Sequence, residues 1–214
     1  MPYNFDYSNR KPHRTYSIMR PVARLLLKLR YKTVYIGKEN LPKDGGYIIA
    51  SNHITALDPV LICVGCDRPI HFMAKNEVFQ NQFTGWAMTK LNAFPVDRSK
   101  FDEDAINYAV TLVNDGNILG IFPEGTRSPD FTPQKGKGGV CYIAKKCKCD
   151  VVPVSIYTSD EAKAGTRLTV RYGEPIKHED LKFDPNSTKM KDLRHATNLI
   201  MEKITELWSL KHGD

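Results

Sequence analysis

Residues 93–122, AFPVDRSKFDEDAINYAVTLVNDGNILGIF, hold two short apolar runs on either side of a helical pattern. The runs AFPV (93–96) and ILGIF (118–122) have the length and composition of buried strands. Between them, residues 102–115 repeat apolar side chains at helical spacing. A strand, a helix and a second strand in this order are typical of an α/β sheet.

The same alternation runs through most of the 214-residue chain. Further strands are predicted at 33–37, 47–51, 70–74, 151–156 and 168–172, and further helices at 58–65, 79–91, 138–147 and 190–211. We therefore predict an α/β fold whose mixed, mostly parallel central sheet is flanked by helices. Functional loops are expected at the carboxyl ends of its strands.

The first 40 residues differ from the rest in charge. They hold nine Lys or Arg and two Asp or Glu, so their net charge of +7 equals that of the whole chain. Residues 1–14 lack apolar periodicity and are expected to form a loose tail. Residues 16–30 predict an amphipathic helix, with Pro21 near its start. Its apolar face is Ile18, Val22, Leu25, Leu26 and Leu29, and its basic face is Arg20, Arg24 and Lys28.

A basic arm on an electrically neutral body favours an anionic surface, either a membrane or a nucleic acid. We predict that residues 1–40 form a basic tail and an interfacial helix, and that residues 41–214 form one domain. Packing of residues 16–30 on the protein's own core is the alternative. No run approaches 18 consecutive apolar residues, so no helix of ordinary length is expected to span a bilayer. The first residues are too polar for a signal peptide.

Five cysteines are present, which is an odd number without a recognisable export signal. We expect them to be reduced thiols. The spacing of Cys147 and Cys149 is wrong for a zinc knuckle, and Cys63 and Cys66 lie in an apolar stretch, so no metal site is predicted.

Three polar segments follow predicted strands, where a site is expected. SNHITALDP (51–59) places His53 and Asp58 five residues apart across a strand-to-helix turn. A histidine that abstracts a proton needs a carboxylate to hold its tautomer and to stabilise the imidazolium. Asn52 can fix the turn by bonding its own backbone. The alternative is a surface turn in which Asp58 caps the next helix.

FPEGTRS (122–128) combines a glycine with phosphate-binding side chains. Gly125 permits a left-handed backbone, Thr126 and Arg127 can donate to a phosphate, and Glu124 can accept from a substrate hydroxyl. FPVDRS (94–99) again ends a strand with an arginine, Arg98. An ordinary turn with an ion pair is the alternative for each segment taken alone.

Taken in order, NHITALD, FPVDR, FPEGTRS and VPV (152–154) resemble the sequence blocks of the glycerolipid acyltransferase family. The resemblance is closest to the bacterial 1-acylglycerol-3-phosphate acyltransferases and covers about residues 43–160. FMAKNEVF (72–79) and KGKGG (135–139) resemble two further family segments, which place Lys75 and Lys137.

The resemblance implies transfer of a fatty acyl group from a thioester to a glycerolipid hydroxyl. His53 would be the general base and Asp58 its orienting group. Backbone N–H groups near the start of the following helix are candidates to bind the oxyanion. The resemblance implies a substrate-binding set of Arg98, Arg127, Lys75, Lys137, Glu124, Gly125 and Thr126. Within that set the cationic side chains hold the acceptor phosphate, and Glu124 holds a glycerol oxygen.

We predict acylation of the sn-2 hydroxyl of 1-acylglycerol-3-phosphate, which gives phosphatidate. The expected partners are lysophosphatidic acid, acyl-CoA or acyl-carrier protein, and anionic lipids at the cytoplasmic face of a membrane, to which the protein is peripheral. Neither a cofactor nor a nucleic acid is expected. Glycerol 3-phosphate or another lysophospholipid is an alternative acceptor. A further alternative is that the protein is a thioesterase, for which water is the acceptor. A non-catalytic basic membrane-binding module is the alternative of a different class.

Overall fold

The computed structural model describes residues 3–184 and 193–213. Within these residues the strands form one seven-stranded sheet in the order β1-β7-β6-β2-β5-β3-β4, in which the β6–β7 pair is antiparallel and every other pair of neighbours is parallel. Their bounds are β1 (Lys32–Ile36), β2 (Tyr47–Ser51), β3 (Ile70–Lys75), β4 (Ala93–Val96), β5 (Ile118–Ile121), β6 (Val151–Tyr157) and β7 (Arg167–Tyr172). The predicted mixed, mostly parallel sheet is confirmed.

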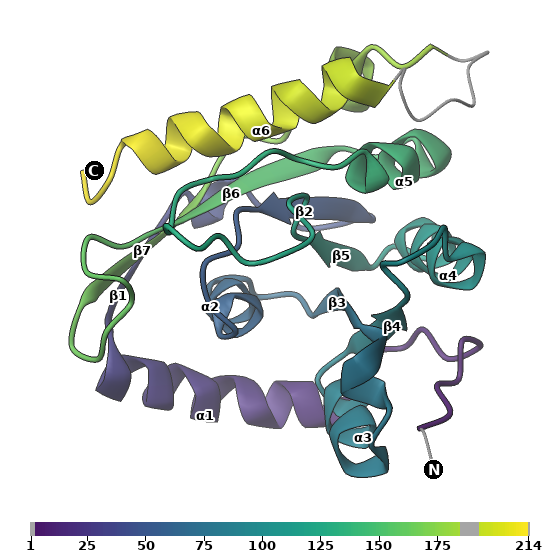
Figure 1. The fold of residues 1–214 in the computed structure, drawn as a ribbon, viewed down its shortest axis with the longest axis horizontal. Coiled ribbons are helices and arrows are strands. Elements are labelled where there is room, and N and C mark those ends of the chain that lie inside the picture. Colours follow the sequence, from purple (N-terminus) through teal and green to yellow (C-terminus); the bar gives the residue numbers. More distant parts are fainter. Residues whose placement is uncertain (1–2, 185–192, 214) are drawn as a thin grey trace.

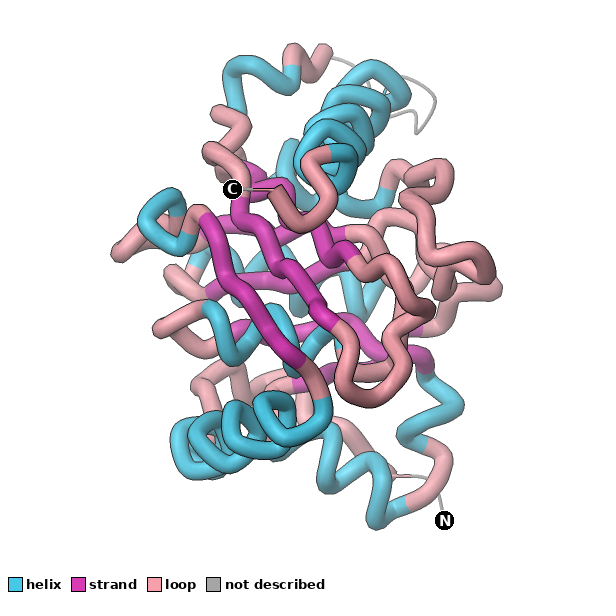
Figure 2. The backbone as a smooth tube through the Cα atoms, turned by 90° about the vertical axis from the view of Figure 1, so that its left-hand side faces the viewer, coloured by secondary structure: helices cyan, strands magenta, loops and turns pink. Residues whose placement is uncertain are grey.

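Helices cover both faces of this sheet (Figures 1 and 2). On one face lie α4 (Glu103–Asn114), α5 (Gly139–Cys147) and α6 (Arg194–Ser209), and on the other α1 (Arg14–Arg30) and α2 (Asp58–Gly65). Helix α3 (Gln82–Lys90) packs beside the edge strand β4. Short 3-10 helices occupy η1 (Lys38–Asn40), η2 (Asn76–Phe79) and η3 (His178–Leu181).

Two predicted helices differ in extent from the structure. The helix predicted at 79–91 is divided into η2 and α3, because the side chain of Asn81 accepts from the amides of Phe83 and Thr84 and caps a new helix there. The helix predicted at 190–211 is described from Arg194 to Ser209, and residues 190–192 of that prediction lie outside the described residues.

The expectation of a loose N-terminal tail is wrong for residues 3–13. The amide of Tyr3 donates to the carbonyl of Phe79 at 2.9 Å. The ring of Phe5 packs edge-on against Phe79 and Tyr108, with centroids 6.2 and 5.5 Å away. Aromatic burial of this kind needs no periodic pattern, because each ring finds its own pocket. Residues 1 and 2 lie outside the described residues.

Helix α1 packs on the body of the protein through part of its basic face and not through its apolar face. Its basic side chains Arg20 and Arg24 point inward and donate to the last carbonyls of α2, those of Cys63 and Val64, at 3.2–3.3 Å. Arg20 also pairs with Asp67 at 2.8 Å. Cations at a helix C-terminus are favoured by its dipole and its unpaired carbonyls. Arg20 and Arg24 are therefore part of the packing between α1 and α2, whereas Lys28 is exposed.

The apolar face of α1 is left open. Ile18, Val22, Leu25, Leu26 and Leu29 are 45–76% exposed, whereas Tyr16 and Leu27 are buried. The helix thus docks on the body without covering the face that the sequence marks as apolar. Because α1 begins at Arg14, Pro21 lies within the helix and not near its start as predicted. Among the described residues, no helix is long and apolar enough to cross a bilayer.

Candidate active site

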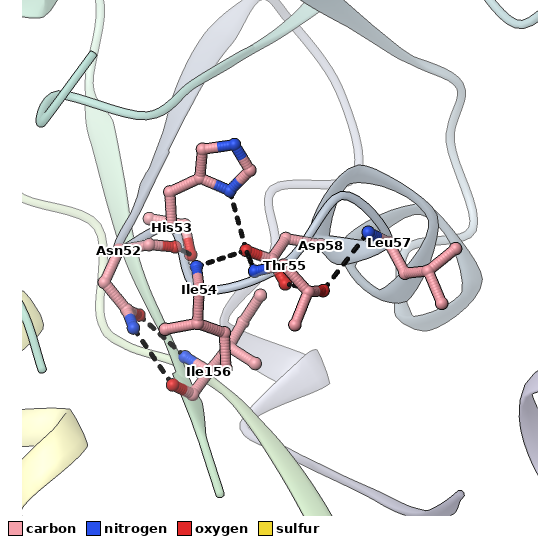
Figure 3. A network of polar contacts seen from close by, with 8 residues as sticks. Asn52, His53, Ile54, Thr55, Leu57, Asp58 and Ile156 are labelled. Atoms are coloured by element: carbon pink, nitrogen blue, oxygen red, sulfur yellow. Dashed lines mark hydrogen bonds and ion pairs between the residues drawn. The ribbon is translucent and has the colours of Figure 1, made fainter. Parts of the chain in front are cut away.

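The site forms where β2, β3, β4 and β5 end, because parallel neighbours bring their carboxyl ends to the same edge of a sheet. His53 follows β2 and Asp58 begins α2. The His53 Nδ1 atom lies 2.7 Å from Oδ2 of Asp58, and Nε2 points away from that carboxylate (Figure 3). The side chain of Asp58 is fully buried and that of His53 is 14% exposed. The predicted pair is therefore in contact.

Asp58 is held by the loop that precedes it. Its Oδ2 atom accepts from the amides of Ile54 and Thr55 at 2.6 and 2.8 Å, and its Oδ1 accepts from the Thr55 hydroxyl at 2.7 Å. The alternative in which Asp58 caps the following helix is wrong, because these donors lie upstream of α2. Four hydrogen bonds, including that from His53, hold this carboxylate in one orientation.

The same hydrogen bonds limit which backbone N–H groups near the start of α2 could bind the oxyanion. The amides of Ile54 and Thr55 are engaged by Asp58, and the amide of Leu57 donates to the Thr55 hydroxyl at 3.1 Å. These three N–H groups are therefore occupied within the loop, so the start of α2 does not offer them to a substrate oxygen.

Asn52 holds the loop to the sheet rather than to its own backbone as predicted. Its side-chain amide donates to the carbonyl of Ile156 at 3.0 Å and accepts from the amide of Ile156 at 2.8 Å (Figure 3). Asn52 is fully buried. This pairing with β6 fixes the backbone immediately before His53.

The FPEGTRS segment joins the histidine loop directly. The amide of Ser128 donates to the carbonyl of His53 at 2.7 Å. Gly125 adopts the left-handed backbone that its residue type favours, with φ of 73°. A Cβ atom there would stand 3.1 Å from Nζ of Lys137, so the glycine also permits a close approach by that lysine.

Arg98 and Lys137 meet at this glycine. Nη1 of Arg98 donates to the carbonyl of Gly125 at 2.5 Å, and the backbone amide of Lys137 donates to the carbonyl of Pro123 at 2.8 Å. Burial lowers the pKa of Arg98 somewhat, and the nearby charge of Glu77 opposes that change. Two predicted cations are therefore together at one point of the site.

Three further residues of the predicted substrate-binding set are also exposed. Arg127 and Thr126 are exposed on the loop. Lys75 is also exposed and pairs with Glu77 at 2.6 Å. Glu77 also acts on the charge of Arg98, so the Lys75–Glu77 pair lies near Arg98.

Glu124 is buried next to the histidine loop. Neither carboxyl oxygen has a partner in hydrogen-bond geometry among the described residues. Burial raises the pKa of Glu124 to about 7, and nearby amides of Gln134 and His53 oppose the rise. The raised pKa favours the protonated form of Glu124, which can donate as well as accept a hydrogen bond.

One functional contact was missed by sequence reasoning. The ring of Phe122 stacks on the imidazole of His53, with centroids 4.0 Å apart and an angle of 18° between the planes. Phe122 belongs to the quoted FPEGTRS segment, but we predicted it as the last residue of a strand. The strand β5 ends one residue earlier, at Ile121, so the Phe122 side chain is directed to the histidine.

A largely apolar pocket of about 240 Å³ adjoins the site. Arg98 and Lys137 lie at one part of its wall together with Phe122 and Gly125. The apolar part of the wall is formed by Met73, Val96, Phe101, Ile106, Ile121, Val140 and Ile143. The pocket thus joins a cationic corner to an apolar interior, which suits an amphiphilic ligand.

In the part of the chain that the structure describes, no group of three or more His, Cys, Asp or Glu side chains is placed to bind a metal ion. All five cysteine thiols are free.

Comparison with known proteins relates this geometry to a family. The model of the family described as Acyltransferase matches residues 32–157. The 1-acyl-sn-glycerol-3-phosphate acyltransferase of Bacillus subtilis is 33% identical over 196 residues, which are 90% of this chain and 96% of that protein. The protein of the same name from Streptococcus pneumoniae is 31% identical over 78% of this chain and 64% of its own length.

A solved structure shares the fold. The crystal structure of the 1-acyl-sn-glycerophosphate acyltransferase from Thermotoga maritima matches with a TM-score of 0.69 and 24% identity, over 89% of this chain and 78% of that one. The family model spans more than half of the chain, and the Bacillus relative aligns along nearly all of it. The chain therefore belongs to the acyltransferase family.

Proposed function

We propose that this chain transfers a fatty acyl group from an acyl thioester to the sn-2 hydroxyl of 1-acylglycerol-3-phosphate and so forms phosphatidate. The observation that carries the proposal is the His53–Asp58 contact of 2.7 Å, with Nε2 directed away from the carboxylate. The names of the Bacillus and Streptococcus relatives support the choice of acceptor.

In the proposed reaction, Nε2 of His53 takes the proton of the acceptor hydroxyl while the hydroxyl oxygen bonds to the thioester carbonyl carbon. Asp58 accepts from Nδ1–H and so holds the tautomer in which Nε2 carries the lone pair. The tetrahedral intermediate then breaks its carbon–sulfur bond, and the imidazolium returns the proton to the departing sulfur. An ester and a free thiol result, and His53 is neutral again. The thioester is already activated, so the step requires no covalent protein intermediate and no cofactor.

The acceptor phosphate is proposed to bind at Arg98 and Lys137, where two cations converge on Gly125. An arginine presents paired donors that match a phosphate, whereas a lysine adds a point charge. Arg127 is exposed two residues after Gly125 and is proposed to close on the phosphate when substrate is bound. Glu124 is buried and its carboxyl oxygens have no partner in hydrogen-bond geometry within residues 3–184 and 193–213, and we propose that it holds a glycerol oxygen.

The fatty acyl chain is proposed to occupy the apolar pocket beside Phe122. Burial of each CH₂ contributes about 0.8 kcal/mol, so even a partly buried chain anchors the donor. Acyl-CoA and acyl-carrier protein both present a thioester, and the proposed chemistry accepts either.

Membrane attachment is proposed to use the exposed apolar face of α1. Ile18, Leu25 and Leu29 are 59–76% exposed on one side of this helix. An amphipathic helix of this kind buries its apolar face at the headgroup boundary. Because the proposed acceptor is itself a membrane lipid, a surface that rests on the bilayer brings the site to its substrate. The protein would then be peripheral, at the cytoplasmic face.

Turnover of the purified protein tests the proposal. Thiol release from acyl-CoA and from acyl-carrier protein is measured with lysophosphatidic acid, with glycerol 3-phosphate and without an acceptor. We expect release that depends on lysophosphatidic acid and forms phosphatidate. His53→Ala should abolish it, whereas His195→Ala, at an exposed histidine on α6, should not. Equal thiol release without any acceptor would identify a thioesterase, and no release at all would identify a binding module.

A further inference from the structure

A general base needs more than one fixed contact. The hydrogen bond from Nδ1 of His53 to Asp58 fixes where one ring atom lies. It leaves the plane of the ring free to swing, because the χ2 torsion of histidine is broad and has no sharp staggered minima. An error of about 1 Å in the position of a reacting atom can cost on the order of 100-fold in rate. A second constraint on the ring plane would therefore have a catalytic effect.

Phe122 supplies a flat surface against that plane. Its ring lies 4.0 Å from the His53 ring and is inclined by only 18°. The two residues reach each other from neighbouring parallel strands, since His53 follows β2 and Phe122 follows β5. The imidazole therefore has Asp58 at its edge and an aromatic ring over its face.

Phe122 is itself supported from behind. The ring of Phe72, on β3, lies 5.6 Å from that of Phe122 at an angle of 19°. Phe72 is 5% exposed and belongs to the buried core on the α2 side of the sheet. The three rings of His53, Phe122 and Phe72 thus form a nearly parallel series that ends in the core.

A glycine makes room for the last ring. Gly120 on β5 is the direct neighbour of Phe72 in the parallel pairing of β3 with β5. A Cβ atom at Gly120 would stand 2.3 Å from the Phe72 ring, a distance that no side chain tolerates without movement. The Phe72 ring therefore lies over the glycine, and only glycine at this position leaves it there.

We infer that Phe122 is a positioning residue for His53, and that Phe72 and Gly120 form its support. The inference rests on the proposed role of His53 as the general base. The stack sets the plane of the imidazole while Asp58 sets its rotation in that plane, and together they aim Nε2 at the acceptor hydroxyl. Gly120 acts only through the rings, since it touches no substrate.

The first test is a pair of substitutions at Phe122, assayed with a water-soluble short-chain acceptor and donor. Phe122→Leu removes the flat surface, and we expect kcat to fall by about 10- to 100-fold with little change in either KM. Phe122→Tyr keeps the ring and should restore most of kcat. Phe94→Leu removes a buried phenylalanine on β4 and is the matched control, with kcat near that of the wild type.

The second test does not depend on activity. A ring stacked at 4.0 Å shifts the carbon-bound protons of the imidazole upfield in the NMR spectrum. The His53 signals are identified by their loss in His53→Gln. We expect them to move downfield in Phe122→Leu and in Gly120→Ala, to return in Phe122→Tyr, and to stay in place in Phe94→Leu. If Phe122→Leu does not fold, Phe122→Met takes its place in both tests.

The outcomes separate this inference from the proposed function. Turnover that survives His53→Gln would overturn the general-base role, and with it the positioning role, whatever the spectrum shows. If His53→Gln is inactive, an unchanged kcat or unchanged His53 signals in Phe122→Leu would overturn the positioning role alone. A rise in donor KM without a fall in kcat would also overturn it, because that result would make Phe122 only a wall of the apolar pocket.

Discussion

The guanidinium of Arg98 donates a hydrogen bond to the carbonyl of Gly125 at 2.5 Å, and so connects the end of β4 to the loop after β5. The same side chain thus braces the loop that carries Glu124 and Arg127, and it is also the cation that we propose for the acceptor phosphate. Both arginines are exposed, and the hydrogen bond to Gly125 is what distinguishes Arg98 from Arg127.

Substitution of these two arginines should separate their roles. Arg127→Ala should raise the acceptor KM by about 10- to 150-fold, because a hydrogen bond to a charged group contributes roughly 1.5–3 kcal/mol. Arg98→Ala should raise the acceptor KM and also lower kcat, since the brace on the Gly125 loop is lost. Steady-state kinetics with varied acceptor give both constants. Arg98→Lys is the control that keeps the positive charge. If Arg98→Ala had the kcat of the wild type, the hydrogen bond from Arg98 to the Gly125 loop would have no effect on the chemical step.

Thr55 offers a way to loosen Asp58 without removing its charge. Thr55→Val deletes the hydroxyl that donates to Oδ1 and accepts from the amide of Leu57. We expect a loss of about 1 kcal/mol or more in the free energy of unfolding, measured by denaturant titration, and a lower kcat with an unchanged acceptor KM. Thr55→Ser keeps the hydroxyl and should behave nearly as the wild type. A Val variant with normal kcat would mean that Asp58 needs only its backbone donors.

Glu124 should make stability depend on pH. Burial raises its pKa in the folded protein from 4.5 to about 7. Between these values the folded protein keeps a proton that the unfolded chain has lost, so this contribution to stability is full below about pH 4.5 and is lost as the pH rises through 7. Glu124→Gln cannot lose a proton there. As the pH rises from 5 to 8, the free energy of unfolding of Glu124→Gln should therefore increase relative to that of the wild type, by on the order of 2 kcal/mol.

Denaturant titration of both proteins across that range checks this expectation. Glu77→Gln, at an exposed glutamate, is the control and should show no comparable gain. Parallel curves for wild type and Glu124→Gln would mean that Glu124 is ionised in the folded protein throughout.

The two faces of α1 should respond to different measurements. Arg20→Gln should destabilise the fold by about 1–2 kcal/mol, because it removes the bonds to Cys63, Val64 and Asp67. Lys28→Gln, on an exposed side chain of the same helix, should leave stability unchanged. Thermal or denaturant unfolding of the two variants gives the comparison, and equal effects would contradict the inward role of Arg20.

Vesicle binding should depend on the open face. Leu25→Ser with Leu29→Ser should release the protein from vesicles whatever their charge, since that contribution is apolar burial. Arg14→Gln with Lys28→Gln should weaken binding only to anionic vesicles, by roughly 30-fold at about 1 kcal/mol per basic side chain. Cosedimentation with neutral and anionic vesicles measures both. Binding that neither pair changes would place the membrane contact elsewhere.

The fold class and the family could both be predicted from local sequence patterns. Residues 93–122 predict a strand, a helix and a strand because period and turn chemistry are local properties, and all seven strands appear near their predicted positions. The His53–Asp58 contact was also predictable, since five residues across one turn leave little freedom. The four sequence blocks identified the acyltransferase family for a similar reason: each block is a local run of residues whose order can be read directly.

Contacts between side chains that are distant in the sequence could not be predicted from local patterns. An amphipathic pattern defines two faces of α1 but not which one turns inward, and Arg20 turns inward because the chain path brings the carbonyl end of α2 to it. The tail residue Phe5 is ordered by aromatic partners on η2 and α4, far along the chain. Phe122 meets His53 only because β2 and β5 are neighbours in the sheet. Local patterns fix the elements, whereas contacts between residues distant in sequence depend on how the whole chain packs.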